Sequence, residues 1–296
     1  MLSLTLTRLK LKNPLMLAAG IMGTTGGSLK RIALEGAGAV VTKSIGLEPK
    51  GGHRNPSMVE VDCGYLNAMG LPNPSFRNFQ DEIDIAREGG VPVVASIFGG
   101  CTEEFSEIAG TIKADALELN VSCPHAHGYG ADIGTDSGLV EDITHEVKKA
   151  AQVPVWVKLT PNVTDIKSIG LGAQRGGADA VVAINTLRGM AIDIESGYPI
   201  LGNRFGGLSG RAIKPVAIKC VYDLYEALDI PVIGVGGISD WKDAVEFIMA
   251  GARAVQIGSA VGNNMDIFMD ISSGMEAFLK EKELTLEEIY GMAHEL

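Results

Sequence analysis

The feature that most constrains the fold is a series of eight short apolar segments separated by longer amphipathic ones. Runs such as Val-Pro-Val-Val and Ile-Pro-Val-Ile-Gly-Val are continuously apolar, as strands covered on both faces of a parallel sheet must be. The predicted strands are Leu15–Ala19, Ala39–Ser44, Pro92–Ile97, Ala116–Val121, Pro154–Leu159, Ala180–Ile184, Pro231–Val235 and Ala254–Ile257. Amphipathic periodicity predicts helices between them, among them Glu103–Ile112, Val140–Ala150, Asp165–Arg175, Pro215–Leu228 and Trp241–Ala250.

Strand and helix alternate eight times in about 260 residues, which predicts a (β/α)8 TIM barrel. A doubly wound sheet is the alternative, but it has no obvious place for the last two strands. No solenoid repeat or low-complexity linker divides the chain, so we expect a single domain over residues 1–296. Leu4–Lys10 is predicted as a strand before the barrel, half of a hairpin that closes its bottom. Leu284–Leu296 is predicted as a short helical tail on the outer wall.

Two connections are too long to be simple loops. Gly46–Pro74 follows the second predicted strand and Leu187–Arg211 follows the sixth. Both come after strand carboxyl ends, the face where barrels build active sites, and long loops are usually functional. A third loop, His125–Gly138, is rich in Gly, Asp and His and is predicted to be a mobile lid.

Charge and cysteine usage exclude several classes of protein. The formal net charge of −11 argues against a nucleic-acid or anionic-membrane surface. The four cysteines, Cys63, Cys101, Cys123 and Cys220, show no C-x-x-C spacing, so no disulfide framework, structural zinc or iron–sulfur cluster is expected in this chain. We find no signal peptide and no apolar run of the roughly 18 residues that a transmembrane helix needs. We therefore expect a cytoplasmic protein.

The fourth predicted strand ends in a run of small polar groups, Asn120-Val121-Ser122-Cys123-Pro124. Because strand side chains alternate, Asn120 and Ser122 should point one way and Val121 and Cys123 the other. Pro124 breaks the strand, so Cys123 can turn into the same pocket as Asn120. A cysteine that only packs in the core is the alternative interpretation.

Glycines follow the last two strands, in Gly234-Val235-Gly236-Gly237 and Gly258-Ser259. Backbone N–H groups there can converge on an anion, and loops after strands seven and eight form the common phosphate site of barrels. Lys43 and Lys158 each end an otherwise apolar strand, where an unpaired buried ammonium would be costly. We take the two lysines to indicate an anionic or electron-rich ligand at the mouth.

Seven motifs together resemble class 1 dihydroorotate dehydrogenases, over nearly the whole chain and in order. They are Val-Thr-Lys-Ser, Leu-Asn-Ala-Met-Gly-Leu-Pro-Asn, Asn-Val-Ser-Cys-Pro, Ile-Asn-Thr, Gly-Gly-Leu-Ser-Gly, Gly-Val-Gly-Gly-Ile and Gln-Ile-Gly-Ser. The resemblance implies oxidation of dihydroorotate to orotate in pyrimidine (UMP) biosynthesis, with FMN at the barrel mouth and Cys123 as the catalytic base. It implies that FMN is held by Gly20, Lys43, Ser44, Asn120, Lys158, Ile184, Gly210, Gly236, Gly237, Gly258 and Ser259. It implies that the substrate is held by Lys43, Asn67, Ala68, Met69, Gly70, Leu71, Asn120, Asn185 and Thr186.

The sequence departs from the family pattern at some positions, and it is compatible with alternative functions. Ser96 and His125 stand where related chains commonly have Asn, and Cys123, His125 and His127 have no obvious fourth partner for a metal site. The alternatives are another FMN barrel, a dihydropyrimidine or dihydrouridine reductase, or a barrel that binds a phosphorylated ligand without redox chemistry. The motifs resemble the NAD-linked type more closely than the fumarate-linked one. The resemblance therefore implies a homodimer that binds a companion subunit carrying FAD and an iron–sulfur cluster.

Overall fold

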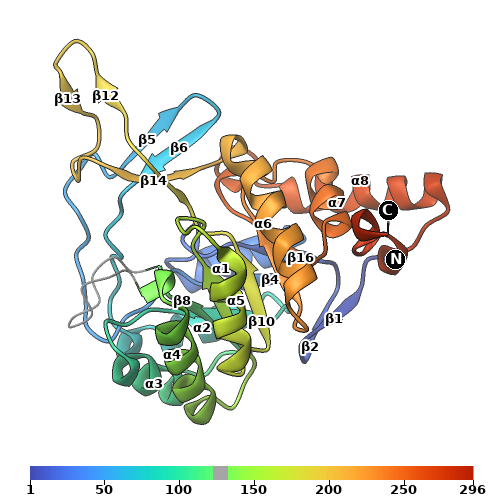
Figure 1. Cartoon of the computed structure of the whole chain (residues 1–296), viewed down its shortest axis with the longest axis horizontal. Helices are drawn as coiled ribbons and strands as arrows, with labels where there is room; N and C mark the ends of the chain where they lie inside the picture. Colours follow the sequence, from blue (N-terminus) through green and yellow to red (C-terminus); the bar gives the residue numbers. More distant parts are fainter. Residues whose placement is uncertain (123–132, 296) are drawn as a thin grey trace.

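The centre of the molecule is a closed barrel of eight parallel strands, in the order β10-β15-β16-β3-β4-β7-β8-β9 (Figure 1). This computed structural model describes residues 1–122 and 133–295. The barrel strands are β3 (Leu15–Leu17), β4 (Ala39–Val41), β7 (Val93–Ile97), β8 (Ala116–Asn120), β9 (Val155–Leu159), β10 (Ala180–Ala183), β15 (Val232–Val235) and β16 (Ala252–Ile257). Each coincides with a predicted strand, so the TIM barrel is confirmed. The doubly wound alternative is wrong because the sheet closes.

Helices pack around the barrel and cover its outer face (Figure 1). The five predicted helices are confirmed as α3 (Thr102–Thr111), α4 (Ser137–Ala150), α5 (Ile166–Arg175), α6 (Lys214–Ala227) and α7 (Trp241–Met249). Asp136, Asp165 and Asp240 cap α4, α5 and α7 by accepting backbone N–H hydrogen bonds in the first turn. Three further helices are α1 (Gly26–Leu34), α2 (Gln80–Arg87) and α8 (Ile267–Lys282). No helix in the described part of the chain is long and apolar enough to cross a membrane.

Both ends of the chain lie against the barrel scaffold. The segment predicted as one strand, Leu4–Lys10, is a complete hairpin of β1 (Leu4–Leu6) and β2 (Leu9–Leu11), because the chain reverses at Thr7 with a positive φ of 54°. The predicted helical tail contains the short helix α9 (Leu286–Ile289). It is held against α7 by a hydrogen bond from Gly291 N to Ile248 O of 3.0 Å.

The two long loops form one shared antiparallel sheet, which their sequences alone did not indicate. Its strand order is β11-β14-β6-β5. The first loop supplies β5 (Met58–Val61) and β6 (Gly64–Asn67), and the second supplies β11 (Leu187–Gly189) and β14 (Gly206–Ser209). A small hairpin, β12 (Ile192–Asp193) and β13 (Tyr198–Pro199), projects beyond this sheet, away from β1 and β2 (Figure 1).

The predicted lid, His125–Gly138, lies mostly outside the described residues. Its described end forms a 3-10 turn, Ile133–Thr135, followed by the start of α4 at Ser137. Gly138 therefore belongs to a helix, and the predicted loop is shorter at this end.

Two apolar cores hold the barrel. The larger lies between the strands and the helices, and Val121 belongs to it, which confirms that this residue points away from Asn120. The smaller lies inside the barrel and combines strand residues such as Met16, Val94 and Trp156 with Leu6 and Leu11 of the hairpin. The hairpin thus closes the end of the barrel at which the strands begin.

Candidate active site

The barrel interior changes from apolar to polar toward the carboxyl ends of the strands. Strand alternation places residues two apart on the same face, so the inward row of β9 runs from Trp156 to Lys158. The inward row of β8 likewise runs from Ala116 through Glu118 to Asn120. Ser96 and Gln256 occupy the matching level on β7 and β16, and both are fully buried. The same strands therefore build an apolar floor and a polar upper layer.

Lys158, Glu118 and Gln256 form a closed polar triangle inside the barrel. Lys158 Nζ lies 3.3 Å from Glu118 Oε1 and donates to Gln256 Oε1 at 3.2 Å. Gln256 Nε2 donates to Glu118 Oε2 at 2.6 Å. The side chains of Lys158 and Glu118 are 7% and 0% exposed. The charge of Lys158 therefore has an internal counter-ion, so this lysine does not by itself indicate an external anion.

A second row of hydrogen-bonded polar side chains crosses the mouth of the barrel, closer to the carboxyl ends of the strands. Asn185 Nδ2 donates to Asn120 Oδ1 at 3.4 Å, and Asn120 Nδ2 donates to Ser44 Oγ at 3.1 Å. Ser44 Oγ is also 3.0 Å from Ser96 Oγ. Predicted site residues from three separate strand ends are thus brought together. Ser96 lies beneath them as a buried support for Ser44.

Lys43 differs from Lys158 because its ammonium has no internal counter-ion in the described residues. It is half-buried, and burial lowers the pKa of its ammonium below the ordinary 10.5. A partly desolvated cation without a counter-ion gains from binding an anion. Both lysines were predicted to bind an anionic ligand. Among the described residues, Lys43 is the one of the two whose charge is unpaired.

The glycines after β15 and β16 offer unused backbone donors. In the described chain, the N–H groups of Gly236, Gly237, Gly258 and Ser259 donate no hydrogen bond to another protein group. Gly236 and Gly237 have φ values of 136° and 80°, and a Cβ on Gly237 would lie 2.8 Å from the Lys214 side chain. Side chains are thus excluded from this turn, and an anion can approach the backbone.

Three other predicted cofactor residues adjoin these glycines or the mouth. Ile184 is buried and donates from its N–H to Val235 O at 2.8 Å, immediately before Gly236. Gly210 O lies 2.9 Å from the position of a Cβ on Gly237. Gly20 has a φ of 91°, and no heavy atom lies within 4 Å of where its Cβ would be. The backbone there is open to a ligand.

The predicted substrate loop, Asn67–Leu71, begins at the end of β6 and is tied down from both sides. Asn67 Nδ2 donates to Gly207 O at 3.3 Å. Ala68 N donates to Ser57 O at 2.7 Å, and His53 N donates to Met69 O at 3.0 Å. Gly70 and Leu71 both have positive φ, at 74° and 55°. The loop thus has a fixed backbone beside the sheet that the two long loops share.

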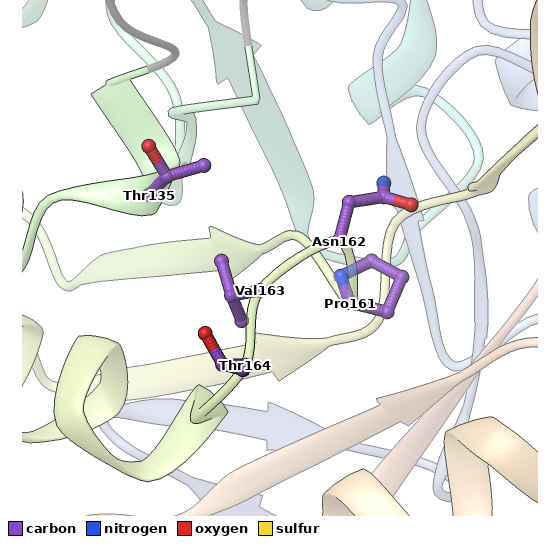
Figure 2. Close-up of a pocket in the computed structure, with 5 residues that line it drawn as sticks. All are labelled: Thr135, Pro161, Asn162, Val163 and Thr164. Atoms are coloured by element: carbon purple, nitrogen blue, oxygen red, sulfur yellow. The ribbon is translucent and has the colours of Figure 1, made fainter.

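Asn185 and Thr186 are positioned by contacts that the sequence did not indicate. Thr186 packs against Gly207, where a Cβ would lie 2.0 Å from Thr186 Oγ1, so only glycine fits. Asn162 Nδ2 donates to Thr186 O at 3.0 Å. Figure 2 shows Asn162 beside a hollow of 390 Å³ lined also by Thr135, Pro161, Val163 and Thr164. Asn162 therefore joins the loop after β9 to the loop that carries Asn185.

Cys123, His125 and His127 lie outside the described residues, so the structure does not test their predicted roles. Within the described ranges, no group of three or more His, Cys, Asp or Glu side chains could hold a metal ion.

Glu118 and Gln256 are the principal site residues that sequence reasoning missed. A usable signal was present, because Ala-Leu-Glu-Leu-Asn places one carboxylate in the middle of a strand predicted to be buried. Such a charge requires a partner, and Lys158 on the next strand was already a candidate. Glu118 also lies two residues before Asn120, and therefore on the same face.

The arrangement suits a planar, polar and anionic ligand. In the part of the chain that the structure describes, it offers amides at the mouth, the Lys43 ammonium without a counter-ion, the Lys158 ammonium paired inside the barrel, and backbone N–H donors without acceptors. The glycine turn fits a phosphate group, and the amide and lysine groups fit a ring with several acceptors. A phosphorylated flavin meets both requirements.

Comparison with known proteins gives one consistent family. The family model for dihydroorotate dehydrogenase matches residues 1–279. The chain is 68% identical over 287 residues to the dihydroorotate dehydrogenase B (NAD(+)) catalytic subunit of Methanocella arvoryzae, covering 97% of this chain and 95% of the relative. It is 66% identical to the protein of the same description from Methanosarcina mazei, covering 99% and 95%. It is 55% identical to that of Methanocaldococcus jannaschii, covering 100% and 99%.

Proposed function

Because the chain belongs to the dihydroorotate dehydrogenase family, we propose that it oxidises dihydroorotate to orotate in pyrimidine biosynthesis. The observation that carries this proposal is 68% identity to a catalytic subunit of that name over 97% of the chain. The same similarity favours this reaction over the dihydropyrimidine and dihydrouridine reductases and over a barrel without redox chemistry.

The family is flavin-dependent, and we propose FMN as the flavin. Its phosphate would lie against the N–H groups of Gly236, Gly237, Gly258 and Ser259, with Gly20 leaving room for it and Gly210 beside Gly237. Its ring would lie at the level of Ser44, Asn120 and Lys158, with Ile184 beside it. When bound, FMN supplies an acceptor for a hydride.

The substrate is proposed to bind between Lys43 and the fixed loop Asn67–Leu71. Lys43 would neutralise the substrate carboxylate, since its ammonium has no counter-ion among residues 1–122 and 133–295. Asn67, Asn120 and Asn185 would bind the ring amides and carbonyls, with Thr186 at the edge. Amide side chains both donate and accept, so they match a ring that presents both kinds of group.

Cys123 is proposed to remove the proton from the ring carbon next to the one that loses the hydride. A thiol with an ordinary pKa of about 8.5 is a usable base near neutral pH if the pocket favours its thiolate. Its neighbour in sequence, Ser122, donates from its N–H to Asn120 Oδ1 at 3.3 Å, so the chain enters this segment directly from the polar mouth.

We further propose that electrons leave through a separate subunit, because the relatives are described as NAD(+)-dependent catalytic subunits. The proposed assembly is a homodimer of this chain, with a companion subunit carrying FAD and an iron–sulfur cluster. Alone, the chain should reduce artificial dyes and hardly reduce NAD. Fast turnover with fumarate by the isolated chain would contradict this choice of acceptor.

The test of the proposed function is reconstitution followed by ligand binding. Apoprotein titrated with FMN should bind one flavin per chain, and orotate should then perturb the visible absorbance of the bound flavin. A protein that binds no FMN would exclude the flavoenzymes. A protein that binds FMN but responds to uracil or uridine in place of orotate would favour the reductases.

A further inference from the structure

Lys158 is held by two groups that both lie inside the protein. An ammonium has three N–H donors. One donates to Gln256 Oε1 at 3.2 Å, and Glu118 Oε1 forms an ion pair with Nζ at 3.3 Å without accepting a hydrogen bond. Within the described residues, Glu118 Oε1 has no other partner. Among the described residues Lys158 has no third partner, so one N–H is available for a ligand, and the contacts with Gln256 and Glu118 fix the position of the ammonium.

Lys158 lies at the level of the polar residues at the mouth. Lys158 is in register with Asn120 on the neighbouring strand β8, and Asn120 belongs to the row of polar side chains that crosses the mouth. Glu118 precedes Asn120 by two residues on the same face and is fully buried, so it lies one level deeper. Glu118 is thus too deep to touch a ligand at the mouth and can act on one only through Lys158.

We propose that Glu118 is a positioning residue that, with Gln256, clamps the Lys158 ammonium so that one N–H points at the flavin. This inference rests on the proposed function, because it assumes a flavin at the mouth. The clamp needs one carboxylate and one amide. Gln256 accepts from Lys158 with its oxygen and donates to Glu118 with its nitrogen, so the group at 118 must accept from Gln256 and carry the negative charge that pairs with Lys158.

The same donor count predicts which substitutions break the clamp. In Glu118→Gln, the new amide has two possible arrangements. Either its nitrogen faces the nitrogen of Gln256, so that two donors meet, or one of the two amides turns its nitrogen toward the Lys158 ammonium, so that two donors meet there. Either way, one of the three contacts is lost and the buried ammonium loses its counter-ion. In the exchange variant E118Q/Q256E, the carboxylate at 256 and the amide at 118 can remake both contacts with Lys158 and the contact with each other. Net charge is also unchanged.

The experiment measures FMN binding to apoprotein by flavin fluorescence, together with thermal unfolding of the same apoprotein. We expect E118Q to weaken FMN binding about 10–100-fold, the scale of a charge-assisted hydrogen bond. The exchange variant should return to within about threefold of wild type. Asp179→Asn is the matched control, because Asp179 pairs with Lys148 at 2.6 Å near the start of β10. It should lower the unfolding temperature and leave FMN affinity unchanged.

A purely structural role for Glu118 predicts a different pattern, in which E118Q resembles D179N: the unfolding temperature falls and FMN affinity does not. That pattern would overturn the proposal. So would an exchange variant that folds but still binds FMN more than about tenfold more weakly than wild type. If E118Q does not fold, the exchange variant decides, and its own failure to fold also counts against the proposal. A wild-type chain that binds no FMN would instead contradict the proposed function.

Discussion

The two ends of the barrel interior are built from the same strands, but one end is apolar and the other is polar. At the end where the strands begin, Met16 and Trp156 pack with Leu6 and Leu11 of the β1–β2 hairpin in an apolar cluster. Two residues further along β9, Lys158 enters a network with Glu118 and Gln256. One strand thus moves from an apolar floor to a polar upper layer within a single inward step.

This difference separates the part of the interior that stabilises the fold from the part that can bind a ligand. Burial of apolar side chains at the floor stabilises the fold, whereas each buried polar group above it must find a partner merely to avoid a cost. The upper layer nevertheless leaves the Lys43 ammonium without a counter-ion and several glycine N–H groups without acceptors in the described residues. Donors without acceptors at the mouth of the barrel are what a ligand site requires. Substitutions at the two ends should therefore have separable effects.

The largest expected effect concerns Cys123, at the polar end. Cys123→Ala should slow flavin reduction by dihydroorotate about 10²–10⁴-fold, the usual contribution of a positioned base, while FMN stays bound. Rapid-mixing absorbance measurements give the rate, and flavin content gives the occupancy. The matched control is Cys220→Ala, because Cys220 belongs to α6, and burial raises the pKa of its thiol to about 11. Near-wild-type reduction by Cys123→Ala would remove this residue from the mechanism.

At the apolar end, Leu6→Ala should reduce the free energy of unfolding by about 2–5 kcal/mol, the range for large-to-small core substitutions. Leu6 is fully buried against the inner barrel residues. Denaturant titration measures the change, and FMN affinity of the folded protein should be unchanged. Ile194→Ala, at a side chain that is 89% exposed, should change stability by less than about 0.5 kcal/mol. A loss of FMN affinity in folded Leu6→Ala would show that the two ends are not separable.

Substitutions of Lys43 and Asn67 test which ligand each residue binds at the polar end. Lys43→Ala should weaken both FMN and orotate, and Asn67→Ala should weaken orotate alone. We expect about a 10–100-fold loss of orotate affinity for the lysine and about a 10-fold loss for the amide, since hydrogen bonds to charged groups are stronger. Calorimetry with each ligand separates the two. An equal loss of FMN affinity in both variants would contradict the assignment.

The smallest expected effect is a pH dependence. Burial lowers the pKa of Lys43 below 10.5, so the ammonium is lost at a lower pH than in an exposed lysine. Orotate affinity should therefore fall as pH rises through that lowered pKa. The free energy of unfolding of the apoprotein should instead rise with pH. Burial in the folded state disfavours the Lys43 ammonium, and this cost is lost as the lysine deprotonates. Lys43→Arg keeps its charge there, so its orotate affinity should fall less. An identical profile in both proteins would assign the titration to another group.

The sequence predicted the barrel because its signals are local. All eight strands are short apolar runs, and periodicity within each segment is enough to find them. It did not predict α1, whose first two residues are the poor helix formers Gly26 and Gly27. Nor did it predict the sheet shared by the two long loops, since β6 and β14 pair across more than a hundred residues of sequence.

The candidate site shows the same limit. Ser44, Asn120 and Asn185 could be placed at one mouth because all follow parallel strands. Which lysine carries an unmatched charge depends on Glu118 lying beside Lys158 on the neighbouring strand, a pairing that the mid-strand carboxylate indicated but that our prediction did not use. Pairing between strands, rather than residue type, decided the role of each lysine.

The central claim is that the polar end of the barrel brings dihydroorotate and a flavin together for hydride transfer. Anaerobic mixing of the FMN-loaded chain with dihydroorotate tests it most directly, with the visible flavin absorbance as the readout. The account predicts that this absorbance is lost on mixing, and that orotate added beforehand slows the loss. Persistent flavin absorbance, in a protein with FMN bound and dihydroorotate in excess, would contradict it.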